Sequence, residues 1–180
     1  MAAVCVRPLR ASDVPQIQSL HVRLPLPKAT SAHPAQAQIL PVHYSHAFFT
    51  QLLVLPSRAC LVAARLDHPH SPVAFISAAL HKSPGLPRIE LLTLGVLPAF
   101  QNRGLARRLI SAVIDKLHGP LAAGILVHAN VAATNSVALK FYKNIGLRIS
   151  SEVIPNLYRT CPPGQRDAYL VAGRIDTISI

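Results

Sequence analysis

The chain has 180 residues and a mass of 19.4 kDa, which is enough for one domain around a single hydrophobic core. Apolar residues make up 51% of the chain and charged residues 14%, a composition that excludes disorder throughout. Eighteen Lys and Arg against seven Asp and Glu give a net charge of +11, which favours an anionic partner such as nucleic acid, a phosphorylated cofactor or an acidic surface.

The first third of the chain predicts a strand, two helices and a long loop. Alternating apolar residues precede Pro8, and the pair Ser12-Asp13 can cap a helix with apolar side chains at helical spacing. A second helix can begin after Ser45 and is ended by Pro56. The segment between the two helices is rich in Pro, Ala, His, Gln and Ser, which is typical of a surface loop. The predicted ranges are a strand at 4–6, a helix at 14–24, a loop at 25–41 and a helix at 46–55.

The remainder predicts three strands, a helix, a strand, a helix and two final strands. Apolar runs separated by turn-rich segments favour an antiparallel meander for the first three of these strands. The most regular helical spacing of apolar residues starts after Gly104 and stops at Gly119-Pro120. The predicted strands are 59–66, 72–81, 88–97, 123–128, 147–153 and 167–175, and the predicted helices are 104–118 and 135–144. This order indicates one mixed α/β domain over residues 1–180, with a core at about 3–175.

A strand turns into the most regular helix near Gly104, and this junction can bind an anion. A glycine lets a ligand approach the backbone, and the amides of a first helical turn are free to donate hydrogen bonds. The helix dipole, Arg103, Arg107 and Arg108 add positive charge that suits a pyrophosphate. The alternative is a tight turn followed by a solvated basic helix face.

The run Gln101-Asn102-Arg103-Gly104-Leu105-Ala106 resembles the Gln/Arg-x-x-Gly-x-Gly/Ala signature of the GNAT acetyltransferases. Asn135, Ala138, Tyr142 and Gly146 are similar to the second conserved segment of that family, in the expected order. The resemblance implies the GNAT acyl-CoA N-acyltransferase fold, an α/β (α+β) fold with a mixed seven-stranded sheet, about four helices and splayed central strands. Within the family, the chain is most similar to the catalytic subunit of the NatE type, which acetylates protein N-termini.

Acetyl-CoA is the cofactor that this resemblance implies, with CoA as the product. Its pyrophosphate would lie on the turn before the helix, its pantetheine arm along the preceding strand, and its thioester beside Asn135 and Tyr142. The implied binding residues are Leu94, Gly95, Val96, Gln101, Asn102, Arg103, Gly104, Leu105, Ala106, Asn135 and Tyr142.

Two catalytic tasks follow from acyl transfer to an amine: protonation of the departing thiolate and deprotonation of the attacking amine. Tyr142 is a candidate donor to the thiolate, and the alternative is an ordinary half-buried helix tyrosine. Alignment places Glu90 where NatE-type subunits have a tyrosine, and burial in an apolar strand makes a carboxylate a better proton acceptor. Near the exposed start of its strand, Glu90 could instead pair with Arg88 or Lys82.

A second basic group is expected on the strand at 123–128 or just after it. An ungapped alignment from Asn135 places Asn130 at the histidine position of the family, whereas a two-residue bulge places His128 there. His128 could relay a proton through water, whereas Asn130 could only position that water. The base is therefore Glu90, His128 or a bound water, and a buried histidine without a catalytic role is the alternative for His128.

The resemblance also implies a peptide site with an apolar wall and tyrosine hydroxyls. Its members would be Leu40, Pro41, Val42, Tyr44, Leu92, Leu157 and Tyr158. Such a pocket favours a retained Met followed by a hydrophobic residue. Leu157 replaces a second tyrosine of the family, so affinity or selectivity would differ. Core packing around Pro41 is the alternative for the loop.

The sequence therefore predicts a protein Nα-acetyltransferase that works by direct attack in a ternary complex. The alternatives are a weakly active scaffold-docking CoA-binding module and an acetyltransferase for lysine or small amines. The resemblance implies docking on the NatA auxiliary subunit, and the basic charge suggests contact with the ribosome surface. We expect no metal, since His68 and His70 lack nearby ligands and the three cysteines are widely spaced. Without a long apolar run or secretory signal, a cytoplasmic location is expected, with the nucleus as a possible additional location.

Overall fold

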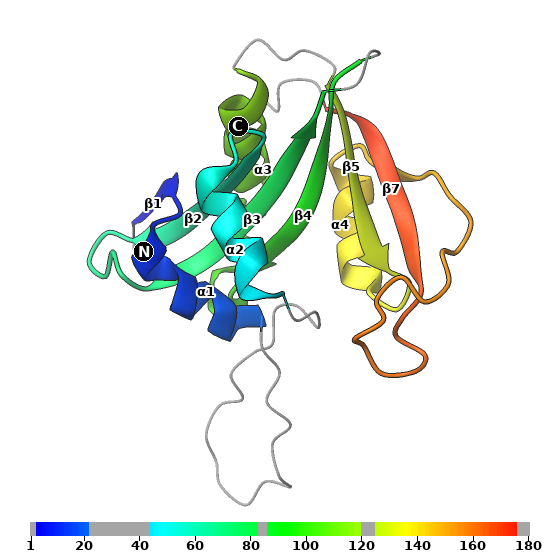
Figure 1. The fold of residues 1–180 in the computed structure, drawn as a ribbon, viewed down its shortest axis with the longest axis horizontal. Helices are drawn as coiled ribbons and strands as arrows, with labels where there is room; N and C mark the ends of the chain where they lie inside the picture. Colours follow the sequence, from blue (N-terminus) through cyan, green and yellow to red (C-terminus); the bar gives the residue numbers. More distant parts are fainter. Residues whose placement is uncertain (1–2, 22–43, 83–85, 120–124, 176–180) are drawn as a thin grey trace, which may run out of the picture.

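The computed structural model describes residues 3–21, 44–82, 86–119 and 125–175. These residues form a seven-stranded mixed sheet in the order β1-β2-β3-β4-β5-β7-β6, together with four α-helices (Figure 1). The strands are β1 (Val4–Pro8), β2 (Arg58–Arg65), β3 (Pro72–His81), β4 (Arg88–Val96), β5 (Ile125–Ala132), β6 (Arg148–Ile149) and β7 (Ala168–Ile175). The helices are α1 (Val14–His21), α2 (His46–Val54), α3 (Leu105–His118) and α4 (Ser136–Asn144), with 3-10 turns at Ala11–Asp13 and Pro98–Phe100. The predicted fold class and element order are confirmed.

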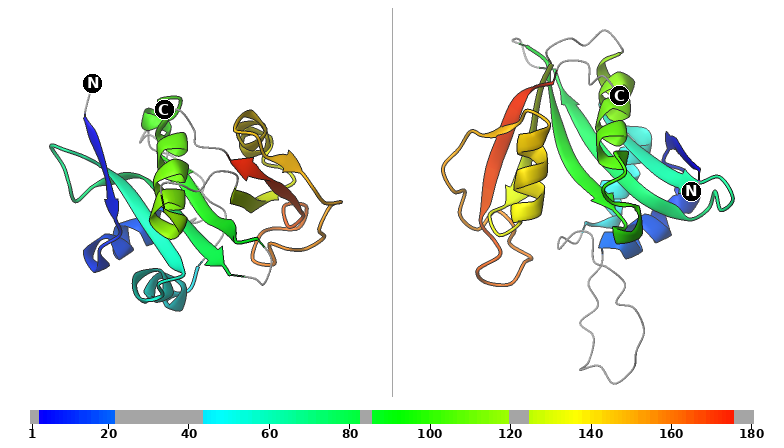
Figure 2. Two further views of the ribbon diagram at one scale, coloured as in Figure 1. Left: turned by 90° about the horizontal axis from the view of Figure 1, so that it is seen from above. Right: turned by 180° about the vertical axis from the view of Figure 1, so that it is seen from behind.

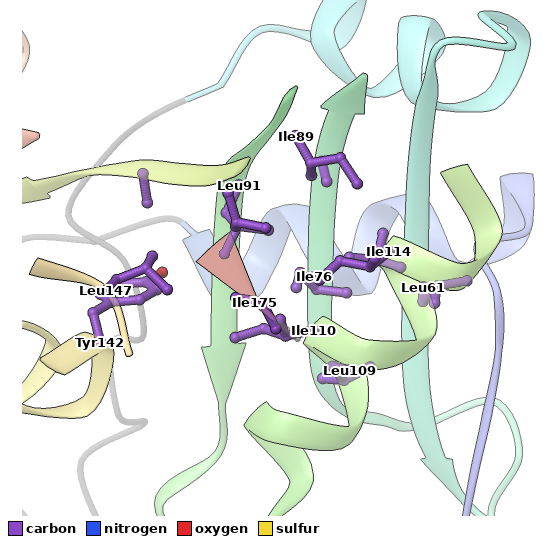
Figure 3. Packing of buried hydrophobic residues seen from close by; sticks show 14 of the residues in the cluster. Leu61, Ile76, Ile89, Leu91, Leu109, Ile110, Ile114, Tyr142, Leu147 and Ile175 are labelled. Atoms are coloured by element: carbon purple, nitrogen blue, oxygen red, sulfur yellow. The ribbon is translucent and has the colours of Figure 1, made fainter. Parts of the chain in front are cut away.

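The sheet separates two layers of helices. Helices α1 and α2 cover one face, and α3 and α4 lie on the other (Figure 2). The larger core cluster forms on the α3 side, where Leu109, Ile110 and Ile114 face side chains of the strands (Figure 3). A smaller cluster around Ile17, Phe49 and Phe75 packs on the other side. In the described residues, no helix is both long and apolar enough to cross a membrane.

Two strand ends differ from the sequence prediction by four residues, and the other strand boundaries of the described residues agree within two. β5 continues to Ala132 instead of ending at His128, because the polar residues His128 and Asn130 stay in register with β7 on a half-exposed face. The strand predicted at 147–153 is reduced to β6. Beyond it, the amide and Oγ of Ser150 both donate to the Leu170 carbonyl, while Ser151 Oγ accepts from the Leu170 amide, so a side chain replaces one backbone acceptor of the ladder.

The first helix starts at Val14 as predicted, but the prediction that Ser12-Asp13 caps it is wrong. Asp13 lies inside a 3-10 turn that follows Arg10, and its carboxylate accepts from the Arg10 amide. Arg7 on β1 donates two hydrogen bonds to the same carboxylate at 2.6 and 2.9 Å. Asp13 is only 2% exposed, so β1 is bound to the helix layer by a buried ion pair.

Replacing Asp13 by Asn is expected to lower the free energy of unfolding by about 2 kcal/mol, since charge-assisted hydrogen bonds to Arg7 are lost. The hydrogen bonds from Arg7 hold the pKa of Asp13 below its ordinary value. The stabilisation is therefore complete above the ordinary aspartate range and is lost as the pH falls through the lowered folded pKa. Urea unfolding at pH 7 and pH 3 measures this. An equal difference between the two proteins at both pH values would contradict the role of the charge.

Candidate active site

The two central strands β4 and β5 pair over only part of their length. Their parallel ladder runs from Arg88 and Leu126 to Leu91 and Ala129. Beyond this point β4 stays paired with β3, β5 stays paired with β7, and the two strands diverge (Figure 1). The predicted splayed strands are thus present, and they leave unpaired backbone groups on both edges of an opening.

Side chains satisfy three of the carbonyl groups near this opening. The Tyr44 hydroxyl donates to the Leu92 carbonyl at 3.4 Å, and Gln101 Nε2 donates to the Val96 carbonyl at 3.0 Å. On β5, the Tyr158 hydroxyl donates to the Asn130 carbonyl at 2.7 Å. The opening is therefore a structured feature of the fold with donors from three different segments.

A bulge in β4 decides which side chains face which layer. The register with β3 shifts between Ser77 and Ala78, so Leu92 is the extra residue opposite this step. Leu91 belongs to the core on the α3 side, whereas Leu92 packs with the cluster on the α1 and α2 side. Glu90 lies between Ile89 and Leu91, both of which face α3, so its side chain points to the other face, toward the side of Leu92 and Tyr44.

A cleft of about 570 Å³ lies between the end of β4, the start of α3 and the helix α4. Ten of the eleven residues predicted for the cofactor line it: Leu94, Gly95, Val96, Gln101, Asn102, Gly104, Leu105, Ala106, Asn135 and Tyr142. Arg103 stands apart, with its guanidinium carbon 5.4 Å from the centre of the Phe100 ring. Arg107, Phe141 and Asn144 are further lining residues. The sequence motif therefore marks most of one continuous cleft.

The turn before α3 presents backbone amides to this cleft. Asn102 and Gly104 both have positive φ values, 58° and 74°, and Gly104 is the N-cap of the helix. The amide of Arg108 makes the first bond of the helix to the Gly104 carbonyl, so the amides of Leu105, Ala106 and Arg107 have no partner within it. Because the helix dipole adds positive charge at the same place, the turn is suited to a phosphate group.

Helix α4 forms the opposite wall of the cleft. Asn135 caps this helix, and its Oδ1 accepts from the Ala138 amide at 3.0 Å. Arg107 Nη2 donates to the Asn144 carbonyl at 3.2 Å and connects α3 to the end of α4. Tyr142 is 7% exposed and lies beside Leu147 (Figure 3), and burial raises the pKa of its phenol. The phenol therefore stays protonated at neutral pH and can act as a hydrogen-bond donor.

The predicted peptide residues are divided between described and undescribed segments. Tyr44, Leu92 and Tyr158 lie around the opening, and burial raises the pKa of Tyr44 to about 12. Leu157 is 40% exposed on the segment before β7. Leu40, Pro41 and Val42 lie outside the described residues. The site is thus apolar and carries two tyrosine hydroxyls in its described part.

The candidate bases lie near the end of the paired part of β4 and β5. Glu90 on β4 is the register partner of His128 on β5, while Asn130 lies two residues further, beside the opening. Burial lowers the pKa of His128, and nearby Arg88 and His81 act in the same direction against Glu90. His128 is therefore a neutral imidazole at neutral pH.

One residue near Glu90 was not singled out by the sequence. The Nε2 atom of His81, the last residue of β3, lies 2.8 Å from Glu90 Oε2. The side-chain partner of Glu90 in the structure is thus His81, and not Arg88 or Lys82 as the sequence suggested. Ligand-type atoms of His81, Glu90 and His128 all lie within 4.8 Å of one another. Only the pairing of β3 with β4 brings His81 here, because Arg88 is its register partner.

The chain belongs to the acetyltransferase (GNAT) family, whose model matches residues 27–147. The family inferred from the two sequence motifs is thereby confirmed, and the protein is an acetyltransferase of the GNAT kind. A curated relative, the N-alpha-acetyltransferase RimI of Mycobacterium tuberculosis, is 37% identical over 59 residues. This match spans about a third of each protein, 33% of this chain and 34% of the relative.

Two solved structures from Arabidopsis thaliana have the same fold. Naa50, in complex with the bisubstrate analogue CoA-Ac-MVNAL, is 24% identical with a TM-score of 0.67, and the match covers 94% of this chain and 97% of that chain. NAA60, in complex with a bisubstrate analogue, is 23% identical with a TM-score of 0.72, and the match covers 96% and 98%. At these identities the similarity establishes the fold alone.

Proposed function

We propose that this acetyltransferase transfers the acetyl group of acetyl-CoA to the α-amino group of protein N-termini. The observation that carries the proposal is the position of the opening between β4 and β5. The cleft at the start of α3 lies at one end of it, and two tyrosine hydroxyls, of Tyr44 and Tyr158, bind backbone carbonyls on its two edges. A single extended chain end is the kind of acceptor that suits such an opening.

The proposed cofactor position follows from the charges and donors of the cleft. The free amides of Leu105, Ala106 and Arg107 would hold the diphosphate of acetyl-CoA. Backbone groups of β4 between Leu94 and Val96 would hold the amides of the pantetheine arm. The thioester would then lie near Tyr142, deep in the cleft. The similar Naa50 and NAA60 structures, which contain bisubstrate analogues, support this assignment.

Glu90 is the proposed base for the incoming amine. β4 and β5 together contain one acidic residue, Glu90, so a positively charged chain end that enters between them meets a single carboxylate from these strands. Glu90 would accept the proton of the ammonium group and leave a neutral amine. His128 on the facing strand is a neutral imidazole, and it can position a water molecule between Glu90 and the amine of the acceptor.

The neutral amine would attack the thioester carbonyl directly. The new C–N bond forms, the C–S bond breaks, and the second proton of the amine goes to the sulfur of CoA. Tyr142, protonated because burial raises its pKa, can donate a hydrogen bond to that sulfur as its charge develops. The overall reaction releases one proton, which is the proton that Glu90 accepts.

The preference for a retained Met followed by a hydrophobic residue is part of the same proposal. Leu92 and the stacked rings of Tyr44 and Phe48, 4.3 Å apart, provide an apolar surface beside the opening. Leu40, Pro41 and Val42, which lie outside the described residues, are proposed to complete it from the family resemblance. Leu157, exposed on the opposite segment, would leave the chain end with one fewer hydroxyl to bind.

A panel of acceptors tests the proposed function. We expect a Met-Leu peptide to be acetylated at least about 10-fold faster than the same peptide with a blocked N-terminus and an internal lysine, since one hydrophobic pocket contact is worth this much. Spermidine serves as the small-amine comparison. Faster acetylation of lysine or spermidine would assign the enzyme to another acceptor class. Tight CoA binding without turnover on any acceptor would instead favour a scaffold-docking module.

The proposed partners follow from the net charge and from the family resemblance. The net charge of +11 supports contact with the ribosome surface, and salt-dependent co-sedimentation with ribosomes would test it. Docking on an auxiliary subunit of the NatA type, and a cytoplasmic location, are proposed from the resemblance to NatE-type subunits.

A further inference from the structure

His81 joins Glu90 to an imidazole that is more exposed to solvent than the carboxylate itself. The imidazole of His81 is 41% exposed and the carboxylate of Glu90 is 25% exposed, and a 2.8 Å hydrogen bond joins them. β4 carries Glu90 two residues after Arg88, and Arg88 is the register partner of His81. The carboxylate therefore lies diagonally across from an imidazole that is open to water.

The titratable groups at and around this hydrogen bond come from β3, β4 and β5 and from the segment that precedes α2. His128 on β5 has its ring centre 6.1 Å from that of His81. Arg88 on β4 is close enough to lower the pKa of His128, and Tyr44 is close enough for Glu90 to raise the pKa of its phenol. The carboxylate of Glu90 thus bonds one imidazole, that of His81, and lies near a second, that of His128, with a cation and a phenol nearby.

A hydrogen-bonded array explains these contacts better than a metal centre does. Two ligand atoms about 2.05 Å from a tetrahedral zinc ion lie roughly 3.3 Å apart. The atoms of His81 and Glu90 are closer, at 2.8 Å, which is the distance of a charge-assisted hydrogen bond. Arg88 also adds positive charge beside the array, which opposes a divalent cation.

We propose that His81 is a positioning residue for Glu90 that also passes the released proton to solvent. Its Nε2–H group donates to Oε2 of the carboxylate and leaves Oε1 free to face the amine. After Oε1 has accepted the proton of the ammonium group, exchange with water shifts the exposed imidazole to the tautomer protonated on Nδ1, and the carboxyl group turns its O–H toward Nε2. Nε2 then accepts this proton, and Nδ1 releases its own proton to water. Glu90 is then ionised again for the next acceptor.

This inference rests on the proposed function only in that an amine is deprotonated at Glu90. It holds for any amine acceptor, and its test therefore uses whichever acceptor the wild-type protein acetylates fastest. If the wild-type protein acetylates lysine peptides, the N-terminal assignment is wrong and the role of His81 can still be measured. If it acetylates no amine at all, both proposals are overturned.

The test compares His81→Ala, His81→Gln and wild type, with imidazole added to the assay. We expect kcat to fall about 10- to 30-fold in His81→Ala, with the KM for acetyl-CoA unchanged, and 50 mM imidazole to restore about 5-fold or more. His81→Gln keeps a donor to Glu90 but cannot relay a proton, so its kcat should stay low. A purely structural role of His81 would not produce a response to imidazole.

His70→Gln is the matched control, because His70 is exposed in the turn at the opposite end of β3. It should leave kcat unchanged, with or without imidazole. Melting temperatures within about 2 °C of wild type establish that the variants are folded. If His81→Ala does not fold, the comparison with wild type is made with His81→Gln alone. Full activity of His81→Gln, or no imidazole effect on a folded His81→Ala, would overturn the proposal. Loss of wild-type activity with a chelator and its return with zinc would replace it by a metal site.

Discussion

Replacing Gly104 by Asp is expected to raise the Kd for acetyl-CoA by about 100-fold or more. The new carboxylate would lie in the turn before α3, where the free amides of the helix and the side chain of Arg107 provide positive charge. At about 5 Å from a phosphate, in an environment of effective dielectric constant near 20, the repulsion is about 3 kcal/mol. Calorimetric titration with acetyl-CoA and with CoA measures the loss, and both ligands should be affected equally because the diphosphate is common to them.

Gly104→Asn is the control for backbone strain and shape. Asn has nearly the shape of Asp and tolerates positive φ, and a Cβ atom at position 104 meets no atom within 4 Å. We expect Gly104→Asn to stay within about 10-fold of wild type, which separates charge from geometry. An equal loss in the two variants would rule out the electrostatic explanation. Unchanged affinity in Gly104→Asp would place the diphosphate elsewhere.

Local features of the fold could be predicted from the sequence, because they depend on residues that are close in the chain. The apolar spacing between Gly104 and Gly119 defines α3, and Pro and Gly residues mark the turns of the meander. The bulge at Leu92 has no such local signal. It appears only when β4 is paired with β3, and it shifts the alternation by one residue, so that Leu94 and Val96 pack on the same side as Leu91.

The same difference explains which parts of the site were foreseen. The turn around Gly104 is contiguous in sequence, so its motif marks most of the cleft. Glu90 was identified because alignment with the family places it at a tyrosine position, and because an acidic residue is unusual in an apolar strand. His81 could not be identified from the sequence, since its contact with Glu90 depends on the register between β3 and β4. The continuation of β5 beyond His128 was missed because polar residues beside an opening look like the end of a strand.

Replacing Glu90 by Gln is expected to lower kcat by about 10² to 10³-fold at pH 7, the usual contribution of a general base. The affinity for acetyl-CoA should not change, since Glu90 is not among the residues that line the cleft. The defect should depend on pH. An α-amino group has a pKa of about 7.7–8.0, so at higher pH a growing fraction of the acceptor is already neutral and needs no base. The ratio of wild-type to variant rates should therefore shrink as the pH rises above about 8.

Steady-state rates between pH 6.5 and 9.5 measure this ratio, and His128→Gln is the comparison that separates the two candidate bases. His128 is a neutral imidazole that faces Glu90 across the closed end of the ladder, so its loss should cost less than the loss of Glu90 if it only positions water. A larger defect in His128→Gln, with the stronger pH dependence, would make His128 the base. A defect in Glu90→Gln that stays constant over the whole pH range would mean that the carboxylate binds the acceptor without removing its proton.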